Sequence, residues 1–66
     1  MNVHVNGKVE SLPTDCSITI LIEQMDLVGK RIAVELNLDI VPKSEHLQTQ
    51  LKEGDVVEIV HAIGGG

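Results

Sequence analysis

Apolar and polar residues alternate at the start of the chain. Residues 1–6 repeat with a period of two, which is typical of a strand with one face buried. Asn6-Gly7 follows, and both residue types tolerate the positive φ angles of a type I′ turn, so a two-residue hairpin is predicted. Residues 8–12 would form the returning strand, with Val9 facing the core. Pro13 would end it, because proline has no N–H to donate to a neighbouring strand.

The next segment changes period and predicts a helix. Its apolar residues recur at spacings of three and four, which places them on one helical face. These residues are Ile18, Leu21, Ile22 and Met25. We expect Ser17 to cap the first turn, its hydroxyl accepting a bond from a backbone N–H. We expect Gly29 to close the turn out of the helix. A helix this short needs a sheet to pack against.

Two extended segments follow the helix. Residues 32–37 alternate again, and their apolar members Ile32, Val34 and Leu36 should face the core. A second, shorter strand over residues 40–41 would end at the proline that follows it.

The last predicted strand spans residues 55–63. Val57 and Ile59 should face the core, whereas Glu58 and Val60 should face solvent. This assignment matters for function because a slip of one residue in register would exchange the two faces.

The order of these elements predicts the fold class. The predicted order is strand, hairpin turn, strand, helix, strand, short strand and strand. This is the order of the α+β, ubiquitin-like β-grasp. In that fold a mixed sheet of about four to five strands carries one main helix on one face. A chain of 66 residues is enough for one domain. Residues 1–63 would form this domain, and residues 64–66 would form a flexible glycine tail.

Charge and composition exclude several classes of partner. The formal net charge is −5, and the chain has no Phe, Trp or Tyr. Such a surface repels phosphate backbones and anionic lipid, and no aromatic ring is present to stack on bases. We therefore expect neither nucleic-acid nor membrane binding, and a basic surface on a protein partner is the natural complement.

Cellular location is indicated by the cysteine content and the first residues. Cys16 is the one cysteine, so it forms no internal disulfide, and we interpret it as a half-buried residue near the helix start. Residues 1–5 lack a basic segment followed by a long apolar run, so they do not resemble a signal peptide. No apolar stretch is long enough to span a bilayer. A reducing cytoplasm fits these features best.

Metal binding and autonomous catalysis find little support. The three histidines are His4, His46 and His61, and with Cys16 they show no spacing of a zinc motif. The carboxylates include no pair that the pattern places at catalytic separation. We expect no bound metal or cofactor, and no catalytic residue in the chain itself.

The glycines Gly64, Gly65 and Gly66 carry the candidate chemistry. Consecutive glycines lose more backbone entropy on ordering than other residues, so this segment should be mobile. A frayed terminus or an expression linker would look the same. Alternatively, a segment without side chains can thread a narrow channel into an adenylating active site. The α-carboxylate of Gly66, with a reference pKa of about 3.3–3.7, would be ionised there and able to attack a nucleotide phosphate.

Several segments, taken together, resemble one known family. They are Asn6-Gly7, the helix stretch 17–25, Asn37-Leu38-Asp39-Ile40-Val41-Pro42-Lys43-Ser44, Gly54-Asp55-Val56-Val57-Glu58-Ile59-Val60 and Ile63-Gly64-Gly65-Gly66. In this order and spacing the chain is similar, over essentially its whole length, to the thiamine-biosynthesis sulfur carriers of the ThiS family.

The resemblance implies a cycle of sulfur transfer. A ubiquitin-activating-type adenylyltransferase (ThiF-like) would use ATP to adenylate Gly66, and a cysteine desulfurase relay would then convert it to a thiocarboxylate. A thiazole synthase (ThiG-like) would take this sulfur into the thiazole ring. Gly65 and Gly64 would be needed for threading. The chain would thus be a co-substrate and not an enzyme.

We expect partners to dock on the sheet face opposite the helix, at Glu58, Val60 and Ala62. Two features depart from the family pattern: Leu38 occupies a turn position, and His46-Leu47 stand where an aromatic residue is common. Three alternatives stay open. The chain could carry sulfur for molybdopterin synthesis or for tRNA thiolation, or it could be a ubiquitin-like tag or binding module.

Overall fold

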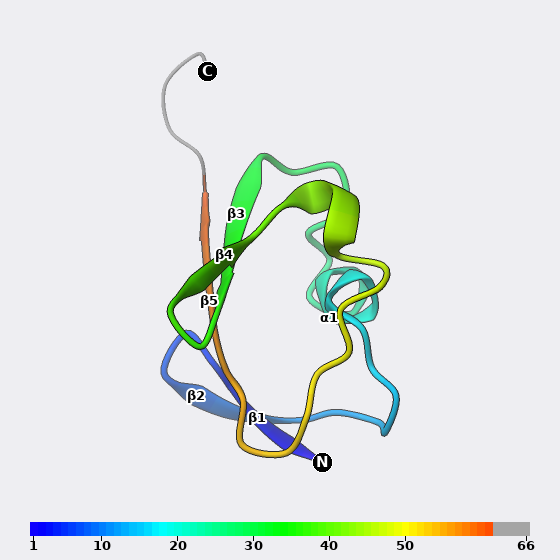
Figure 1. Ribbon diagram of the computed structural model, residues 1–66, viewed down its shortest axis with the longest axis vertical. Coiled ribbons are helices and arrows are strands. Elements are labelled where there is room, and N and C mark those ends of the chain that lie inside the picture. The colour runs from blue at the N-terminus through cyan, green and yellow to red at the C-terminus, as the bar shows by residue number, and fades with distance from the viewer. Residues whose placement is uncertain (62–66) are drawn as a thin grey trace.

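A five-stranded mixed sheet with one α-helix packed on one face forms the body of the protein (Figure 1). The computed structural model describes residues 1–61. The strand order in the sheet is β2-β1-β5-β3-β4, with β1 and β5 parallel and the other neighbours antiparallel. The elements are β1 (Asn2–Val5), β2 (Lys8–Ser11), α1 (Ile18–Gln24), β3 (Ile32–Leu36), β4 (Asp39–Val41), a short 3-10 helix (Lys43–Glu45) and β5 (Val56–His61).

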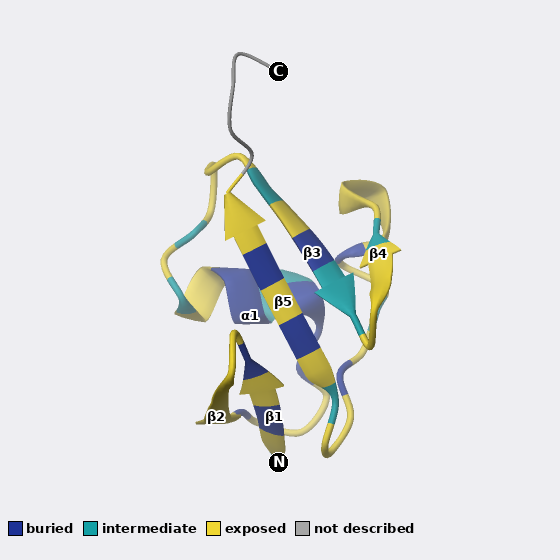
Figure 2. Cartoon of the chain, turned by 90° about the vertical axis from the view of Figure 1, so that its left-hand side faces the viewer, coloured by how far each residue is buried: buried dark blue, intermediate teal, exposed yellow. Residues whose placement is uncertain are grey.

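The core lies between the sheet and α1. Alternate residues of β1, β3 and β5 point inward, as Figure 2 shows by the alternating buried and exposed bands along β5. Val57 and Ile59 are buried, whereas Glu58 and Val60 are exposed, so the predicted faces of the last strand are confirmed. The buried apolar residues are Val3, Val5, Leu12, Cys16, Ile18, Leu21, Ile22, Val34, Leu51, Val57 and Ile59.

The first hairpin turns at Asn6-Gly7, as predicted. Asn6 and Gly7 have φ angles of 51° and 84°, which suit a two-residue turn between β1 and β2. The expectation that Val9 faces the core was wrong, because its side chain is 59% exposed. A two-residue turn pairs Val5 with Lys8, so Val9 pairs with His4 on the opposite face.

The predicted cap of α1 is present. The Ser17 hydroxyl accepts a hydrogen bond of 3.2 Å from the Ile20 N–H. At the other end, the left-handed residue that stops the helix is Asp26, with φ 60°, and not Gly29. The Leu27 N–H reaches back to the Ile22 carbonyl at 3.0 Å, the bond that closes a Schellman motif. Gly29, with φ 81°, shapes the following turn into β3.

Replacing Ser17 by alanine tests the cap. Ser17→Ala leaves a first-turn N–H without its partner, which costs about 1 kcal/mol. We expect Tm to fall by about 4–8 °C in a domain of this size. Ser44→Ala, at an exposed position, is the matched control and should leave Tm within about 2 °C of the wild type. Equal Tm values for both variants would contradict this role of Ser17.

The strand pair β3–β4 also turns on two residues. Asn37 and Leu38 have φ angles of 52° and 76°, and Leu36 pairs with Asp39 across the turn. A leucine in the left-handed region costs energy that glycine would avoid. The Leu38 side chain is 87% exposed, so it gains no compensating burial in the domain.

No helix within residues 1–61 is long and apolar enough to cross a lipid bilayer.

Candidate functional site

The predicted sulfur-bearing segment follows the central strand β5. Gly64, Gly65 and Gly66, together with the predicted docking residue Ala62, lie outside the described residues. The described part of β5 ends at His61, which pairs with Ile32 at the start of β3. The surface around these two strands is therefore the part of the domain nearest in sequence to the glycines.

The face of the sheet opposite α1 carries the other two predicted docking residues. Strand pairing places Val60 beside Ala33, and Glu58 beside Glu35, which in turn neighbours Ile40 of β4. In the view of Figure 2 this face lies in front, with α1 behind the sheet. We call this surface the outer patch; it consists of Ala33, Glu35, Ile40, Glu58 and Val60.

The outer patch combines apolar area with negative charge. Ile40 is 70% exposed and Val60 is 56% exposed. Large apolar side chains exposed on one face of a sheet are typical of a protein-docking surface. The predicted placement of Glu58 and Val60 is thus confirmed by the strand faces, whereas Glu35 and Ile40 join them only through long-range pairing.

Two turn asparagines hold β5 in register beneath this surface. The Asn6 side-chain oxygen accepts a 2.7 Å hydrogen bond from the Ile59 N–H, and the Asn6 N–H donates to the Val57 carbonyl at 2.9 Å. Asn6 thus continues the pairing of β1 with β5 beyond the last residue of β1. At the opposite side, the Asn37 side-chain oxygen accepts a 2.9 Å bond from the Val56 N–H. The sequence predicted Asn6 as a turn residue but placed Asn37 at the end of the strand 32–37, whereas β3 ends at Leu36 and Asn37 lies in the turn.

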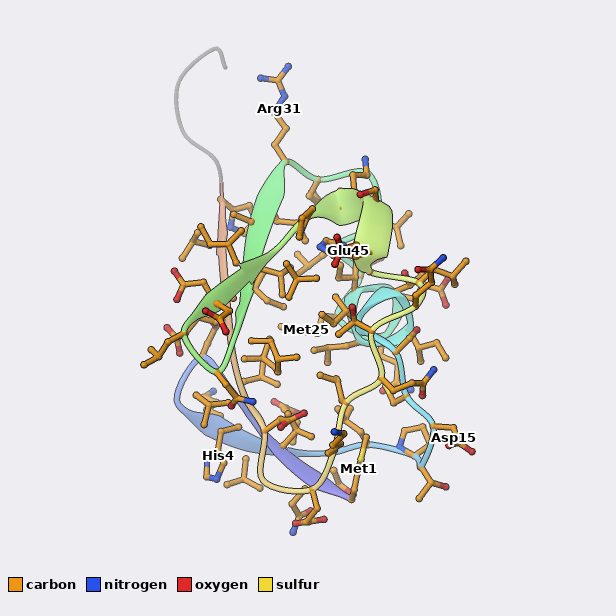
Figure 3. The ribbon with its side chains drawn as sticks, viewed as in Figure 1. Met1, His4, Asp15, Met25, Arg31 and Glu45 are labelled. Atoms are coloured by element: carbon orange, nitrogen blue, oxygen red, sulfur yellow. The ribbon has the colours of Figure 1, made fainter. Side chains whose placement is uncertain are left out.

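The histidines do not converge. His4 pairs with Val56 at one end of the sheet, whereas His61 lies five residues further along β5. Figure 3 shows His4 at the end of the molecule away from Arg31, the residue just before β3. The buried His46 ring donates from Nε2 to the Val41 carbonyl at 3.0 Å. Within residues 1–61, no three His, Cys, Asp or Glu residues gather where they could hold a metal ion.

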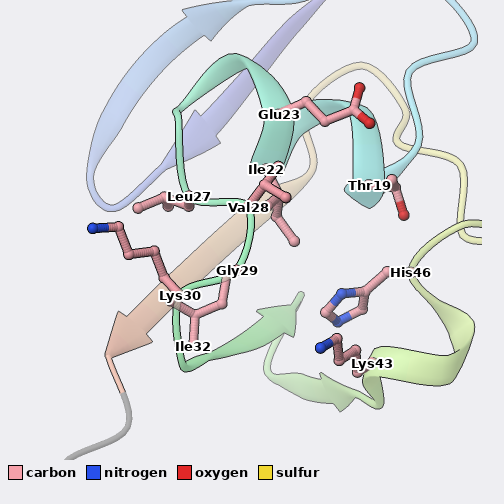
Figure 4. Close-up of a pocket in the computed structure, with 10 residues that line it drawn as sticks. All are labelled: Thr19, Ile22, Glu23, Leu27, Val28, Gly29, Lys30, Ile32, Lys43 and His46. Carbon is pink, nitrogen blue, oxygen red and sulfur yellow. The ribbon is translucent and has the colours of Figure 1, made fainter.

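A small pocket lies on the helix side of the sheet, between the end of α1 and the start of β3 (Figure 4). Its volume is about 220 Å³, below the usual ~300–1,000 Å³ of small-molecule sites. Ile22, Leu27 and Ile32 line its apolar part, and Lys30 and Lys43 contribute amines. The pocket belongs to the face opposite the outer patch.

Cys16 is more deeply buried than its sequence context indicated. Its exposed fraction is 0%, and its thiol lies 3.4 Å from the Ser17 carbonyl oxygen. Burial disfavours the thiolate and raises the pKa of the Cys16 thiol above its ordinary value. A buried, protonated thiol is a poor nucleophile.

Thiol labelling tests this environment. We expect Cys16 to react with a disulfide reagent at pH 8 at least about 100-fold more slowly in the native protein than in denaturant. The raised pKa also makes the free energy of unfolding fall as pH rises above the ordinary thiol pKa of about 8.5, because only the unfolded chain then ionises freely. Below that pH the stability is fully present.

The variant Cys16→Ala provides the control for this pH effect. It should lose the decline in unfolding free energy that begins near the ordinary thiol pKa, whatever its absolute stability. Rapid labelling of the native wild type, or the same pH slope in both proteins, would contradict the burial of a protonated thiol.

Comparison with known proteins supports the resemblance seen in the sequence. A model of the ThiS family matches residues 3–66 of the chain. The sulfur carrier protein ThiS of Bacillus subtilis is 35% identical over 65 residues, covering 97% of this chain and 98% of that protein. A thiazole synthase of Paramagnetospirillum magneticum is 36% identical over 66 residues. This match covers 100% of the chain, which spans only 20% of the length of that synthase.

A solved structure also matches the fold. The crystal structure of the thiamine biosynthesis protein ThiS from Geobacter metallireducens gives a TM-score of 0.87 at 30% identity, covering 100% of both chains. Together with the mixed sheet and its one packed helix, this match confirms the predicted ubiquitin-like β-grasp fold.

Proposed function

The chain belongs to the ThiS family, and we propose that it is a sulfur carrier in thiamine biosynthesis. The observation that carries this proposal is the match to a family model and to a Bacillus sulfur carrier over almost the whole of both chains. The names of the relatives favour thiamine over molybdopterin synthesis or tRNA thiolation as the destination of the sulfur. In this role the chain is a co-substrate, and the catalytic groups belong to its partners.

The proposed chemistry takes place at the carboxylate of Gly66. One carboxylate oxygen attacks the α-phosphorus of ATP, and the bond to the leaving pyrophosphate breaks, which gives an acyl-adenylate. Hydrosulfide then attacks the acyl carbon, and AMP leaves with the oxygen and the former bond pair, which gives the thiocarboxylate. Where a persulfide from a cysteine desulfurase relay supplies the sulfur, a thiol provides the two electrons that release it.

Two enzymes act on this carboxylate in the proposed cycle. A ThiF-like adenylyltransferase supplies the ATP-dependent activation, and a ThiG-like thiazole synthase accepts the sulfur. The partnership with a synthase is supported by two thiazole synthases that resemble the chain. In each of them, a segment of about a fifth of the synthase is similar to the whole of this chain. Gly64 and Gly65 would thread towards each active site, since they have no side chain to clash with a narrow channel.

The outer patch is the proposed docking surface for the activating enzyme. Glu58 and Val60 lie on β5, the strand that precedes the glycines, so an enzyme bound there is close to the segment it must reach. Ala62 would extend this surface. Because apolar side chains already face solvent on the patch, docking would bury them without first unfolding the domain.

The function is tested by a complete reaction. The chain is incubated with ATP, a ThiF-like adenylyltransferase and sodium sulfide, and its intact mass is recorded. The proposal predicts replacement of one oxygen by one sulfur, and no change when ATP is omitted. An unchanged mass with an enzyme shown to activate a known ThiS protein would overturn the proposal. Formation of an isopeptide bond to lysine would instead favour a protein tag.

A further inference from the structure

We propose that Glu35 and Glu58 act together as a paired-carboxylate site for one guanidinium group on the docking surface of the activating enzyme. This inference rests on the proposed carrier function and specifies how the outer patch recognises its partner. It follows from the register of β3 and β5, from the apolar side chains next to the two carboxylates, and from the net charge of the chain.

The register places the two carboxylates side by side. Glu35 of β3 pairs directly with Glu58 of β5 in an antiparallel ladder, so both side chains project from the same face. Directly opposed residues have Cβ atoms about 4.5–5.5 Å apart, and like charges at such positions destabilise a sheet. Glu35 is half-buried and Glu58 is exposed. Among residues 1–61, neither carboxylate forms an ion pair, so the repulsion is not relieved within the described domain.

Apolar side chains lie on two sides of the pair. Ile40 lies next to Glu35 on the outer side of the sheet, and Ala33 and Val60 form the adjacent row of the ladder. A partner that covers Ile40 and Val60 also removes water from the two carboxylates between them. Burying charges is costly unless each one is paired and hydrogen-bonded. The partner must therefore bring a cation to this position.

The geometry favours an arginine over other cations. A planar guanidinium has five N–H donors and can donate to two carboxylates at once, whereas an ammonium is a compact point charge. A divalent ion is disfavoured, since no third ligand gathers there among the described residues. A second copy docked through the same face would bring the same two carboxylates. Nucleic acid is disfavoured by the net charge of −5.

The test compares thiocarboxylate formation by three single variants. Glu35→Gln and Glu58→Gln each keep the side-chain size but remove one charge, and the KM of the activating enzyme for the chain should rise about tenfold or more. Each variant should also have a Tm higher by about 1–5 °C, because the repulsion is removed. Glu10→Gln is the control: it removes a charge from an exposed strand position opposite Val3 and should leave KM unchanged.

A double variant distinguishes one shared guanidinium from two separate contacts. If one arginine bonds to both carboxylates, the KM for the double Gln variant should rise about as much as the KM for either single variant. The proposal would be overturned if the KM increase in the double variant equalled the product of the two single increases. It would also be overturned if the single variants had the KM of the wild type. If wild-type chain gains no sulfur with an active enzyme, the carrier function itself fails, and this inference fails with it.

Discussion

Adding one alanine after Gly66 is expected to abolish thiocarboxylate formation while leaving the domain folded. The extra residue turns the Gly66 carboxylate into an amide, which cannot attack phosphorus. It also moves the new carboxylate by about 3.3–3.6 Å and gives the last residue a Cβ. A displacement of this size is enough to separate reacting atoms that must approach closely. Intact mass after the complete reaction should show no sulfur above the detection limit.

Folding of the extended chain is checked independently. Among residues 1–61, the buried apolar residues lie between Val3 and Ile59, so the Tm of the extended protein should match that of the wild type. Removing the added alanine with a carboxypeptidase that stops at glycine should restore sulfur uptake. Sulfur on the extended chain at the wild-type rate would show that the reaction does not depend on Gly66.

Aspartate substitutions at two positions of β5 should have opposite consequences. Val57 is 0% exposed, and Val57→Asp places an unpaired charge in the core. Such burial costs several kcal/mol, as much as the ~3–5 kcal/mol that a core of this size supplies. Val57→Asp should therefore be unfolded at 25 °C by circular dichroism. Val60 is 56% exposed, and Val60→Asp should fold with nearly the wild-type Tm.

The folded variant then reports on docking. Val60→Asp places a third negative charge beside Glu58 and interrupts the apolar area of the outer patch. The KM of the activating enzyme should rise at least about tenfold. Val9→Asp is the matched control, because Val9 is equally apolar and 59% exposed but lies at the far edge of the sheet on β2. A Val60→Asp chain activated as well as the wild type would place the docking surface elsewhere.

Local sequence patterns predicted most of the fold. The alternation along β5 identified Val57 as buried and Val60 as exposed, because one face of the strand meets the core and the other meets solvent. The spacing of Ile18, Leu21 and Ile22 identified the buried face of α1. Each of these features depends on residues that are close in sequence, which is why the pattern was sufficient.

The predictions for Val9 and for the end of α1 were wrong. Val9 alternates correctly with its neighbours, but the two-residue turn at Asn6-Gly7 fixes which phase of the alternation faces the core. Taking the turn length into account would have paired Val5 with Lys8 and placed Val9 outward. At the end of α1, Gly29 was expected to close the turn, but Asp26 already ends the helix in the left-handed conformation, which a short polar side chain tolerates.

The sequence predicted only some of the residues of the outer patch. Glu58 and Val60 were found because they alternate with core residues on one strand. Glu35 and Ile40 join them through the register of β3 with β5 and β4, which no local pattern fixes. The hydrogen bonds from the backbone of β5 to Asn6 and Asn37 are likewise long-range. The one available signal was the predicted turn at Asn6, because asparagine tolerates the positive φ of such turns.

Locating the sulfur within the product shows whether Gly66 carries it. After the complete reaction, the chain is cleaved after glutamate, and the masses of its fragments are recorded. The proposed function predicts that one sulfur replaces one oxygen in the fragment from Ile59 to Gly66, and that a thiazole synthase removes it. A sulfur added to the fragment that contains Cys16, as in a persulfide, with an unaltered Gly66 fragment, would show that Gly66 is not the carrier.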